Sequence, residues 1–167
     1  MDTTGFNQLM KHLRPKMYRF ALAFVRRSDE AEDVVQDVSE NLWKRRAELD
    51  KVQNVEAYAM HSVKNKCLDC LRTAAHGTVE LNEALQTTHE QTPYRMVEQK
   101  DMADLVRKLA AQLPTLQQMT LRLRDIEGYE LNEIAAIMDM NEGAVRTNLS
   151  RARQRVREWL MVNDKVE

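Results

Sequence analysis

Large apolar residues recur at steps of three and four along both halves of the chain, and this spacing predicts helices that each bury one face. In the first half, three such faces follow one another between residues 6 and 71. The first face holds Phe6, Leu9, Leu13, Met17, Phe20 and Phe24; the second holds Ala31, Val34, Val35, Val38 and Leu42; the third holds Val55, Tyr58, Ala59, Val63, Cys67 and Leu71. The pattern therefore predicts a small helical unit in this half.

A proline and several polar residues predict where these helices begin or break. Pro15 lies inside the first run, where its missing N–H predicts a kink or a break. Ser28 or Asp29 is a suitable N-cap for the second helix, and Glu32 stands three residues after Asp29, as a capping box requires. Asn54 is a suitable N-cap for the third helix.

The helical periodicity fades between about residues 74 and 94, where Gly, Pro and Thr occur and large apolar residues are few. This composition predicts a flexible linker, with a short helical piece around residues 79–85. We therefore expect one domain at residues 1–75, a linker at 76–95 and a second domain at 96–167.

The spacing of a helix returns near Met96 and continues through Leu105 and Leu109 to the pair formed by Leu113 and Pro114. Thr115 is then expected to cap a further helix, which Gly128 would end. A helix-turn-helix pattern follows. Its short first helix would bury Leu131, Ile134, Ala135 and Met138, its turn would lie at residues 141–143, and its second helix would bury Val145, Leu149, Ala152, Val156 and Leu160. Gly143 suits a tight backbone in that turn.

The last of these helices carries five arginines and no acid between Gly143 and Arg157. Helical spacing places Arg146, Ser150, Arg153 and Arg157 in one exposed row, with Thr147, Arg151 and Arg155 beside it. Such a helix suits the major groove of DNA, where its first turns reach base edges and flanking arginines hold phosphates. The alternative is a solvated helix whose arginines pair with acids elsewhere.

Composition excludes several classes of protein. The 167 residues include only four Gly and three Pro, and 5% are aromatic, which favours an all-α fold. No apolar run is long enough to span a membrane, the first residues lack a signal-peptide pattern, and two cysteines make no disulfide framework, so a cytoplasmic protein is expected. No nucleophile-and-base arrangement, phosphate loop or paired-carboxylate site is visible, so we expect neither enzymatic activity nor a cofactor.

The run from Leu113 to Leu160 resembles the fourth conserved region of bacterial sigma-70-family factors, and most closely their extracytoplasmic-function (ECF) class. LPxxxxxxxxLR, EG, EIA, EGAVR and SRARxxVR occur in the order and at the spacing of that family. The resemblance implies an alternative sigma factor with two small helical domains, a region 2 bundle and a region 4 helix-turn-helix. It also implies three partners: RNA polymerase core, contacted at its clamp helices and its flap; promoter DNA; and an anti-sigma factor. Membrane insertion is not expected.

The resemblance implies that the arginine-rich helix contacts the upstream, minus-thirty-five promoter element. The residues expected there are Arg146, Thr147, Asn148, Ser150, Arg151, Arg153 and Arg155. Two positions depart from the family: Ala144 replaces a common Thr, and Asn148 stands where the residue is often basic. Which base Asn148 meets is therefore open.

An acidic segment in the first half matches the family helix that binds the polymerase clamp. Six acids and no basic residue lie between Asp29 and Glu40. By resemblance, Asp33, Gln36, Asp37 and Glu40 carry core binding. The alternative, acids that stabilise the first turn through the helix dipole, explains the earliest acids but not Asp37 and Glu40. Ser39 departs from the large apolar residue usual in the family.

Residues 54–72 are similar to the family segment that opens and reads the downstream, minus-ten element. The matching positions are Lys64, Asn65, Lys66, Asp69 and Arg72. Taken alone, this segment is better explained as a basic solvated helix, and the promoter interpretation is preferred only because the flanking motifs agree with it. Tyr58 is its only aromatic residue for stacking on melted bases, which predicts weak intrinsic melting.

Two competing interpretations stay open. Cys67 and Cys70 form a CxxC flanked by His61 and His76, a pattern that permits a zinc or redox site. Cys67 falls on an apolar helix face, however, where free cysteine acts as a small hydrophobe. The other interpretation is a stand-alone helix-turn-helix regulator, which would bind DNA without polymerase.

Overall fold

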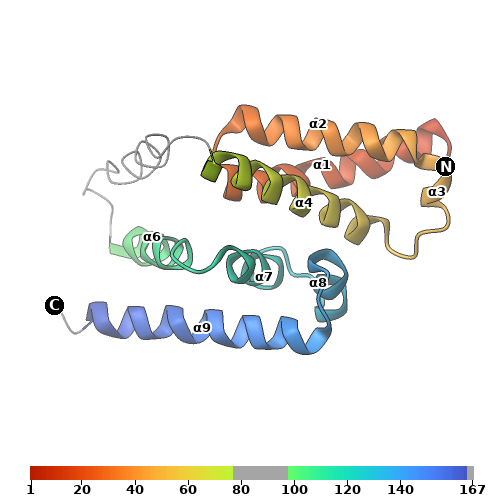
Figure 1. Cartoon of the computed structure of the whole chain (residues 1–167). Coiled ribbons are helices and arrows are strands. Elements are labelled where there is room, and N and C mark those ends of the chain that lie inside the picture. The colour runs from red at the N-terminus through yellow and green to blue at the C-terminus, as the bar shows by residue number, and fades with distance from the viewer. Residues whose placement is uncertain (77–97, 165–167) are drawn as a thin grey trace. The chain divides into compact units, whose positions relative to one another are not determined.

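The computed structural model describes residues 1–76 and 98–164, with side chains described for residues 1–75 and 102–162. The chain divides into two compact units, Met1–His89 and Glu90–Glu167. Within the described ranges every regular element is a helix, so the predicted all-α fold of two small helical domains is confirmed (Figure 1). The predicted helical piece at residues 79–85 and the helical start near Met96 lie outside the described residues.

The first unit is a bundle of three long helices. Helices α1 (Thr3–Val25), α2 (Ser28–Lys44) and α4 (Val55–His76) pack against one another, and the short α3 (Arg46–Leu49) follows α2 (Figure 1). The predicted apolar faces form much of the core, since Leu13, Met17, Phe20, Leu42 and Val63 are among its fully buried side chains; Met60, which was not predicted, is fully buried as well. Four residues of the predicted faces, Leu9, Val55, Tyr58 and Leu71, are only half-buried.

The predicted break at Pro15 is wrong, because α1 continues through that residue. Pro15 is exposed, so the carbonyl of Lys11, which loses its usual N–H partner, lies on the solvent side of the helix. On the opposite side Leu13 and Met17 are completely buried. The packing on either side of the proline holds both halves of α1 in one helix.

The predicted caps of α2 are also wrong. Arg27 holds the N-cap position without a side-chain cap, and Ser28 and Asp29 are already helical. The Asp29 carboxylate instead accepts from the Arg27 guanidinium at 3.2 Å.

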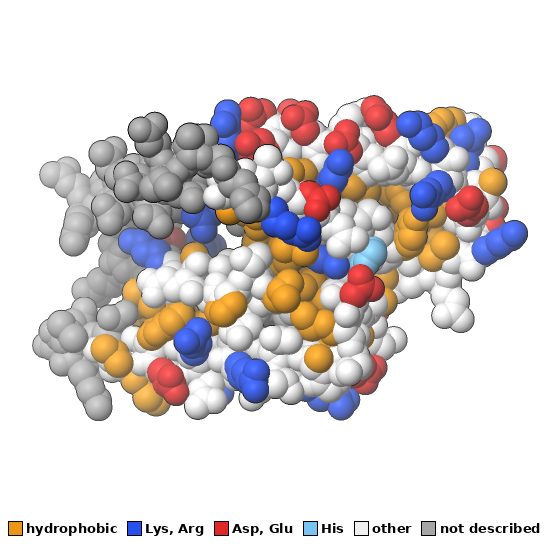
Figure 2. Space-filling model, viewed as in Figure 1, with side chains coloured by type: hydrophobic (Ala, Val, Ile, Leu, Met, Phe, Trp, Pro, Cys, Tyr) orange, Lys and Arg blue, Asp and Glu red, His pale blue; other side chains and the backbone are white. Residues whose placement is uncertain are grey.

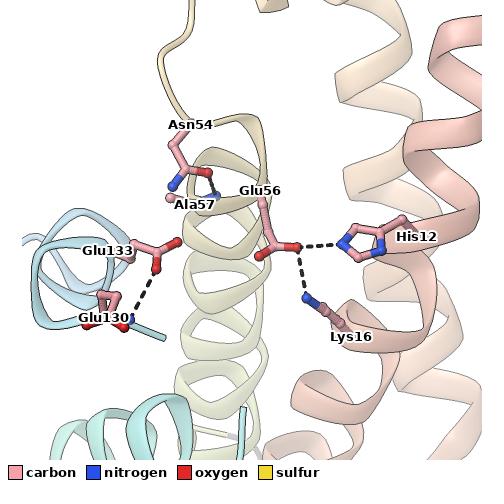
Figure 3. A network of polar contacts seen from close by, with 7 residues as sticks. All are labelled: His12, Lys16, Asn54, Glu56, Ala57, Glu130 and Glu133. Atoms are coloured by element: carbon pink, nitrogen blue, oxygen red, sulfur yellow. Dashed lines mark hydrogen bonds and ion pairs between the residues drawn. The ribbon is translucent and has the colours of Figure 1, made fainter. Parts of the chain in front are cut away.

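The predicted cap of α4 is confirmed. The Asn54 side-chain oxygen accepts from the Ala57 amide at 3.0 Å (Figure 3). Glu56, in the same first turn, ties α4 to α1, because its Oε1 lies 3.1 Å from His12 Nε2 and 3.0 Å from Lys16 Nζ. This end of α4 is therefore held both locally and by its neighbour.

The second unit contains α6 (Glu98–Ala110), α7 (Thr115–Asp125), α8 (Leu131–Met138) and α9 (Glu142–Asp164). Helix α9 packs against the other three. The buried hydrophobic residues are Leu109, Leu113, Met119, Leu123, Tyr129, Ile134, Ile137, Met138, Val145, Leu149 and Ala152, and Thr120 is buried among them. Of the residues expected in this core, Leu131, Ala135, Val156 and Leu160 are half-buried.

Helix α7 begins and ends differently from the prediction. Pro114 occupies the N-cap without a side-chain bond, so Thr115 is the first helical residue rather than the cap. The helix ends at Asp125, three residues before Gly128. The φ of 78° at Gly128 turns the chain, and the Tyr129 amide donates to the Leu123 carbonyl at 2.9 Å.

Candidate nucleic-acid interface

The turn between α8 and α9 fixes the start of the arginine-rich helix. Asp139 makes the turn with a φ of 54°, and the Asn141 side-chain oxygen accepts from the Ala144 amide at 2.7 Å. The predicted place of Gly143 in the turn is wrong, because Gly143 lies inside α9. A Cβ at Gly143 would lie 3.3 Å from the capping oxygen of Asn141, so the glycine leaves room for this cap.

The buried seam of α9 turns its polar residues outward. Val145, Leu149 and Ala152 are buried against the rest of the unit. The exposed residues between and beyond them include Arg146, Thr147, Ser150, Arg151, Arg153, Arg155 and Arg157, together with Gln154 and Glu158. Six of the seven residues predicted for the upstream element are thus exposed, and Asn148 is half-buried.

The first turn of α9 presents side chains that are weakly held. The Arg146 guanidinium lies 3.6 Å from the Glu142 carboxylate, and both side chains are largely exposed. Such a surface pair contributes little, so Arg146 can exchange it for another acceptor. The Thr147 hydroxyl donates to the Gly143 carbonyl at 3.0 Å.

The side-chain amide nitrogen of Asn148 makes its contacts within the protein. Nδ2 donates to the Ala144 carbonyl at 2.9 Å and lies 3.5 Å from the Met140 sulfur. With its donors turned inward, the Asn148 side chain offers an acceptor to the outside. A bidentate contact to adenine, which needs both donor and acceptor, does not fit this arrangement.

Among the residues predicted for the upstream element, Arg153 pairs with a carboxylate of a second helix. Its Nη2 and Nε donate to the two carboxylate oxygens of Asp125 on α7, at 2.5 and 3.3 Å. The hydrogen bond to Asp125 raises the pKa of Arg153 above its ordinary value. For this arginine the alternative interpretation, pairing with an acid elsewhere in the fold, is the one the geometry favours.

The last two arginines differ from Arg153. The Arg155 guanidinium lies 6.0 Å from the centre of the Trp159 ring, and Arg157 Nε donates to the Arg153 carbonyl at 3.3 Å. Neither contact neutralises its charge. This part of α9 therefore keeps a positive exposed surface.

The predicted acidic row lies on the exposed side of α2. Asp33, Gln36, Asp37 and Glu40 are all exposed, and Figure 2 shows acidic side chains gathered along α2. Gln36 Nε2 donates to Glu40 Oε1 at 3.1 Å, and Asp37 pairs with Lys66 of α4 at 3.3 Å. Ser39 is buried beneath the row, where its hydroxyl donates to the Val35 carbonyl at 2.6 Å.

An open groove borders this acidic row and was not foreseen from the sequence. It encloses about 500 Å³, and its lining comes from α1 and α2. The lining residues are Arg14, Pro15, Tyr18, Glu32, Val35 and Gln36. No sequence signal relates the two helices here, because the groove arises from their packing.

The residues predicted for the downstream element differ in exposure along α4. Asn65, Asp69 and Arg72 are exposed, and Lys66 is half-buried beside Asp37. Lys64 is buried, with 4% of its surface exposed, so it can contact DNA only if that side chain becomes exposed. Asn65 Nδ2 lies 3.5 Å from His61 Nε2, and Arg72 lies 3.9 Å from Asp69.

The two cysteines are free thiols in unreactive surroundings. Burial raises the pKa of the Cys67 thiol to about 12, and the pKa of Cys70 is also raised, chiefly by burial and next by Glu30. Among the described side chains, which omit His76, no group of three or more His, Cys, Asp or Glu residues is placed to hold a metal ion. No helix in the described ranges combines the length and the apolar character that crossing a membrane requires.

Comparison with protein families matches each unit separately. Residues 9–76 match the family Sigma-70 region 2, and residues 103–156 match Sigma-70, region 4. The ECF RNA polymerase sigma factor SigM of Mycobacterium tuberculosis is 27% identical over 160 residues, which cover 95% of this chain and 79% of SigM. The ECF RNA polymerase sigma-E factor of Escherichia coli is 26% identical over 168 residues, covering 93% of this chain and 86% of that relative.

Two solved structures share the fold. The sigma factor RpoE of Bartonella quintana, in complex with the anti-sigma factor NepR, has a TM-score of 0.70 at 22% identity, covering 96% of this chain and 99% of RpoE. CnrH, in complex with the cytosolic domain of CnrY, has a TM-score of 0.69 at 21% identity, covering 96% of this chain and 90% of CnrH.

Proposed function

This chain belongs to the extracytoplasmic-function group of the sigma-70 family. From that membership we propose which of its residues bind RNA polymerase and which contact promoter DNA. It is an alternative sigma factor, a binding subunit that directs RNA polymerase to promoters and catalyses no reaction of its own. The observation that carries the proposal is the pairing of an acidic helix in the unit matching region 2 with an arginine-rich helix in the unit matching region 4.

The exposed row of α2 binds the polymerase core. Asp33, Gln36, Asp37 and Glu40 offer acceptors and negative charge beside a buried apolar seam. A basic helical surface, such as the clamp helices of the polymerase, complements this row in charge and accelerates correct docking. The unit matching region 4 makes the second contact, at the polymerase flap.

The first turns of α9 read the upstream promoter element. Arg146 and Thr147 stand at the exposed start of the helix, where a recognition helix contacts base edges. Ser150, Arg151 and Arg155 lie farther along and hold the phosphate backbone. Asn148 takes part only as an acceptor, toward the amino group of cytosine or adenine.

The exposed face of α4 contacts the downstream element. Asn65 binds a base and Arg72 binds the backbone, with Lys66 and Asp69 on the same helix; the exposure of Asn65, Asp69 and Arg72 supports this assignment. Lys64 joins this set once its side chain is exposed. Because these groups offer no aromatic stacking platform, opening of the duplex depends on polymerase and on good promoter matches.

An anti-sigma factor regulates the chain. Support comes from the similar structures, since RpoE is held by NepR and CnrH by the cytosolic domain of CnrY. We place the chain in the cytoplasm, where polymerase and promoters are found.

Measuring promoter binding with and without purified core polymerase tests this function. We expect tight, sequence-selective binding only when core is present. Equally tight and selective binding by the chain alone would instead identify a stand-alone helix-turn-helix regulator.

A further inference from the structure

We propose that Asp125 and Arg153 form a clamp between α7 and α9, and that Arg153 is a positioning residue for promoter reading rather than a phosphate contact. The proposal deepens the function above and rests on it. It assigns different roles to arginines that the sequence places together on one helix.

The clamp is a bidentate ion pair between the Arg153 guanidinium and the Asp125 carboxylate. Two separate guanidinium nitrogens of Arg153 reach two separate oxygens of Asp125, at 2.5 and 3.3 Å. A planar guanidinium that bonds a carboxylate at two points is restrained in orientation as well as in distance. The partners are 28 residues apart, so the pair restrains two helices rather than one turn.

The place of Asp125 supports a role in holding Arg153. It is the last residue of α7, where the helix dipole disfavours a negative charge. A cation from another helix offsets that cost. The two arginines in the last turn of α7 are engaged elsewhere. Arg124 donates to the Tyr129 carbonyl at 2.8 Å and lies 3.7 Å from Glu130, and Arg122 lies 3.8 Å from Glu127.

The place of Arg153 explains why the clamp matters for reading DNA. Arg153 lies seven residues after Arg146, which is about 10 Å along the axis at the rise of an α-helix. On the apolar side, Val145, Leu149 and Ala152 hold α9 in the core. Fixing Arg153 beside that seam restrains rotation of α9 about its own axis. This rotation determines which side chains of the first turn face the major groove of DNA.

The clamp also leaves Arg151 as the neighbouring phosphate contact. Arg151 is exposed and two residues away on the same helix. A phosphate contact releases counterions, so removing one should flatten the salt dependence of DNA binding by about 0.9 in log–log slope. Removing an arginine that is already paired within the protein should leave this salt dependence unchanged. The two arginines therefore differ in a measurable quantity.

The experiment measures promoter binding by the full chain with core polymerase over a salt series, using matched and mutated upstream elements. Arg151→Gln serves as the control and should flatten the slope. Arg153→Gln should leave the slope unchanged and lower discrimination between the two elements by about threefold or more. Asp125→Asn should lower discrimination equally, and the swap of Asp125→Arg with Arg153→Asp should restore it.

Flattening of the slope by Arg153→Gln to the same extent as by Arg151→Gln would overturn the proposal, as would full discrimination by Asp125→Asn. A thermal-unfolding cycle tests the clamp without DNA: the variant with both Asp125→Asn and Arg153→Gln should melt like either single variant. Additive shifts in Tm would contradict the clamp. If the unmodified chain binds no promoter with core, the proposed function fails, and the thermal cycle still decides whether Asp125 and Arg153 are coupled.

Discussion

Reversing the charge of Asp37 is the sharpest perturbation of the proposed polymerase interface. Asp37 lies in the exposed row of α2, where it pairs with Lys66 of α4 at 3.3 Å. Asp37→Arg removes an acceptor from the row and adds a positive charge in its place. We expect the variant to remain folded and to bind polymerase core weakly.

The exposure of Asp37 and Lys66 determines how much the substitution changes the free energy of unfolding. The side chains of Asp37 and Lys66 are 51% and 42% exposed, so their pair contributes about 0–1 kcal/mol to the free energy of unfolding. Against a basic partner surface, the same substitution replaces attraction by repulsion. A loss of about 2 kcal/mol in binding free energy corresponds to roughly 30-fold weaker binding.

The assay is equilibrium binding of the labelled chain to core polymerase without DNA, with thermal unfolding measured in parallel. Lys66→Gln is the matched control, because it removes the same internal ion pair but leaves the Asp37 carboxylate in place. The control should bind core normally. Normal core binding by folded Asp37→Arg would refute the assignment of this row, and equal weakening by Lys66→Gln would trace the effect to the internal pair instead.

Three further predictions concern other parts of the chain. Arg146→Ala should cost about 1–3 kcal/mol of discrimination at one position of the upstream element, measured with core on single-base promoter variants; an unchanged preference would remove Arg146 from the readout. Asn54→Ala should lower the free energy of unfolding by about 1 kcal/mol, because it removes the cap bond to Ala57, and unfolding by denaturant with no change would show that the cap contributes nothing. Because the pKa of Cys67 is raised to about 12, its thiol stays protonated at pH 8 and should react with an aromatic disulfide far more slowly in the folded chain than in denaturant. Stoichiometric zinc in protein purified without added metal would contradict the view that Cys67 and Cys70 are structural.

Local patterns predicted much of the fold because their causes lie within a few residues. The apolar spacing identified the buried face of α2, where Ala31, Val34, Val35, Val38 and Leu42 are all buried. The cap by Asn54 was predictable because donor and acceptor belong to one turn. Motif spacing likewise indicated region 4, which the family comparison confirms at residues 103–156.

Among the local predictions that failed, one failed because of packing between helices and one because another residue of the same turn takes the expected role. Pro15 does not break α1, because buried neighbours on the other side hold the helix together. Gly143 looked like a turn residue, yet Asp139 takes the left-handed conformation and Asn141 closes the turn. In each case the deciding contact involves residues that the local pattern does not weigh.

The roles of individual site residues were the least predictable. Helical spacing places Arg153 in the same exposed row as Arg146, but pairing with Asp125 depends on how α7 packs on α9. Lys64 looked like an exposed cation and is buried. Charge and periodicity describe a helix face, whereas the partner of each charge is set by tertiary structure.

Transcription with purified components tests the central claim most directly. Core polymerase would be mixed with promoter fragments, with and without the chain, and transcripts mapped at their starts. We predict that initiation at defined promoters requires the chain and is lost with Asp37→Arg. Initiation that is the same with and without the chain would contradict its assignment as a sigma factor.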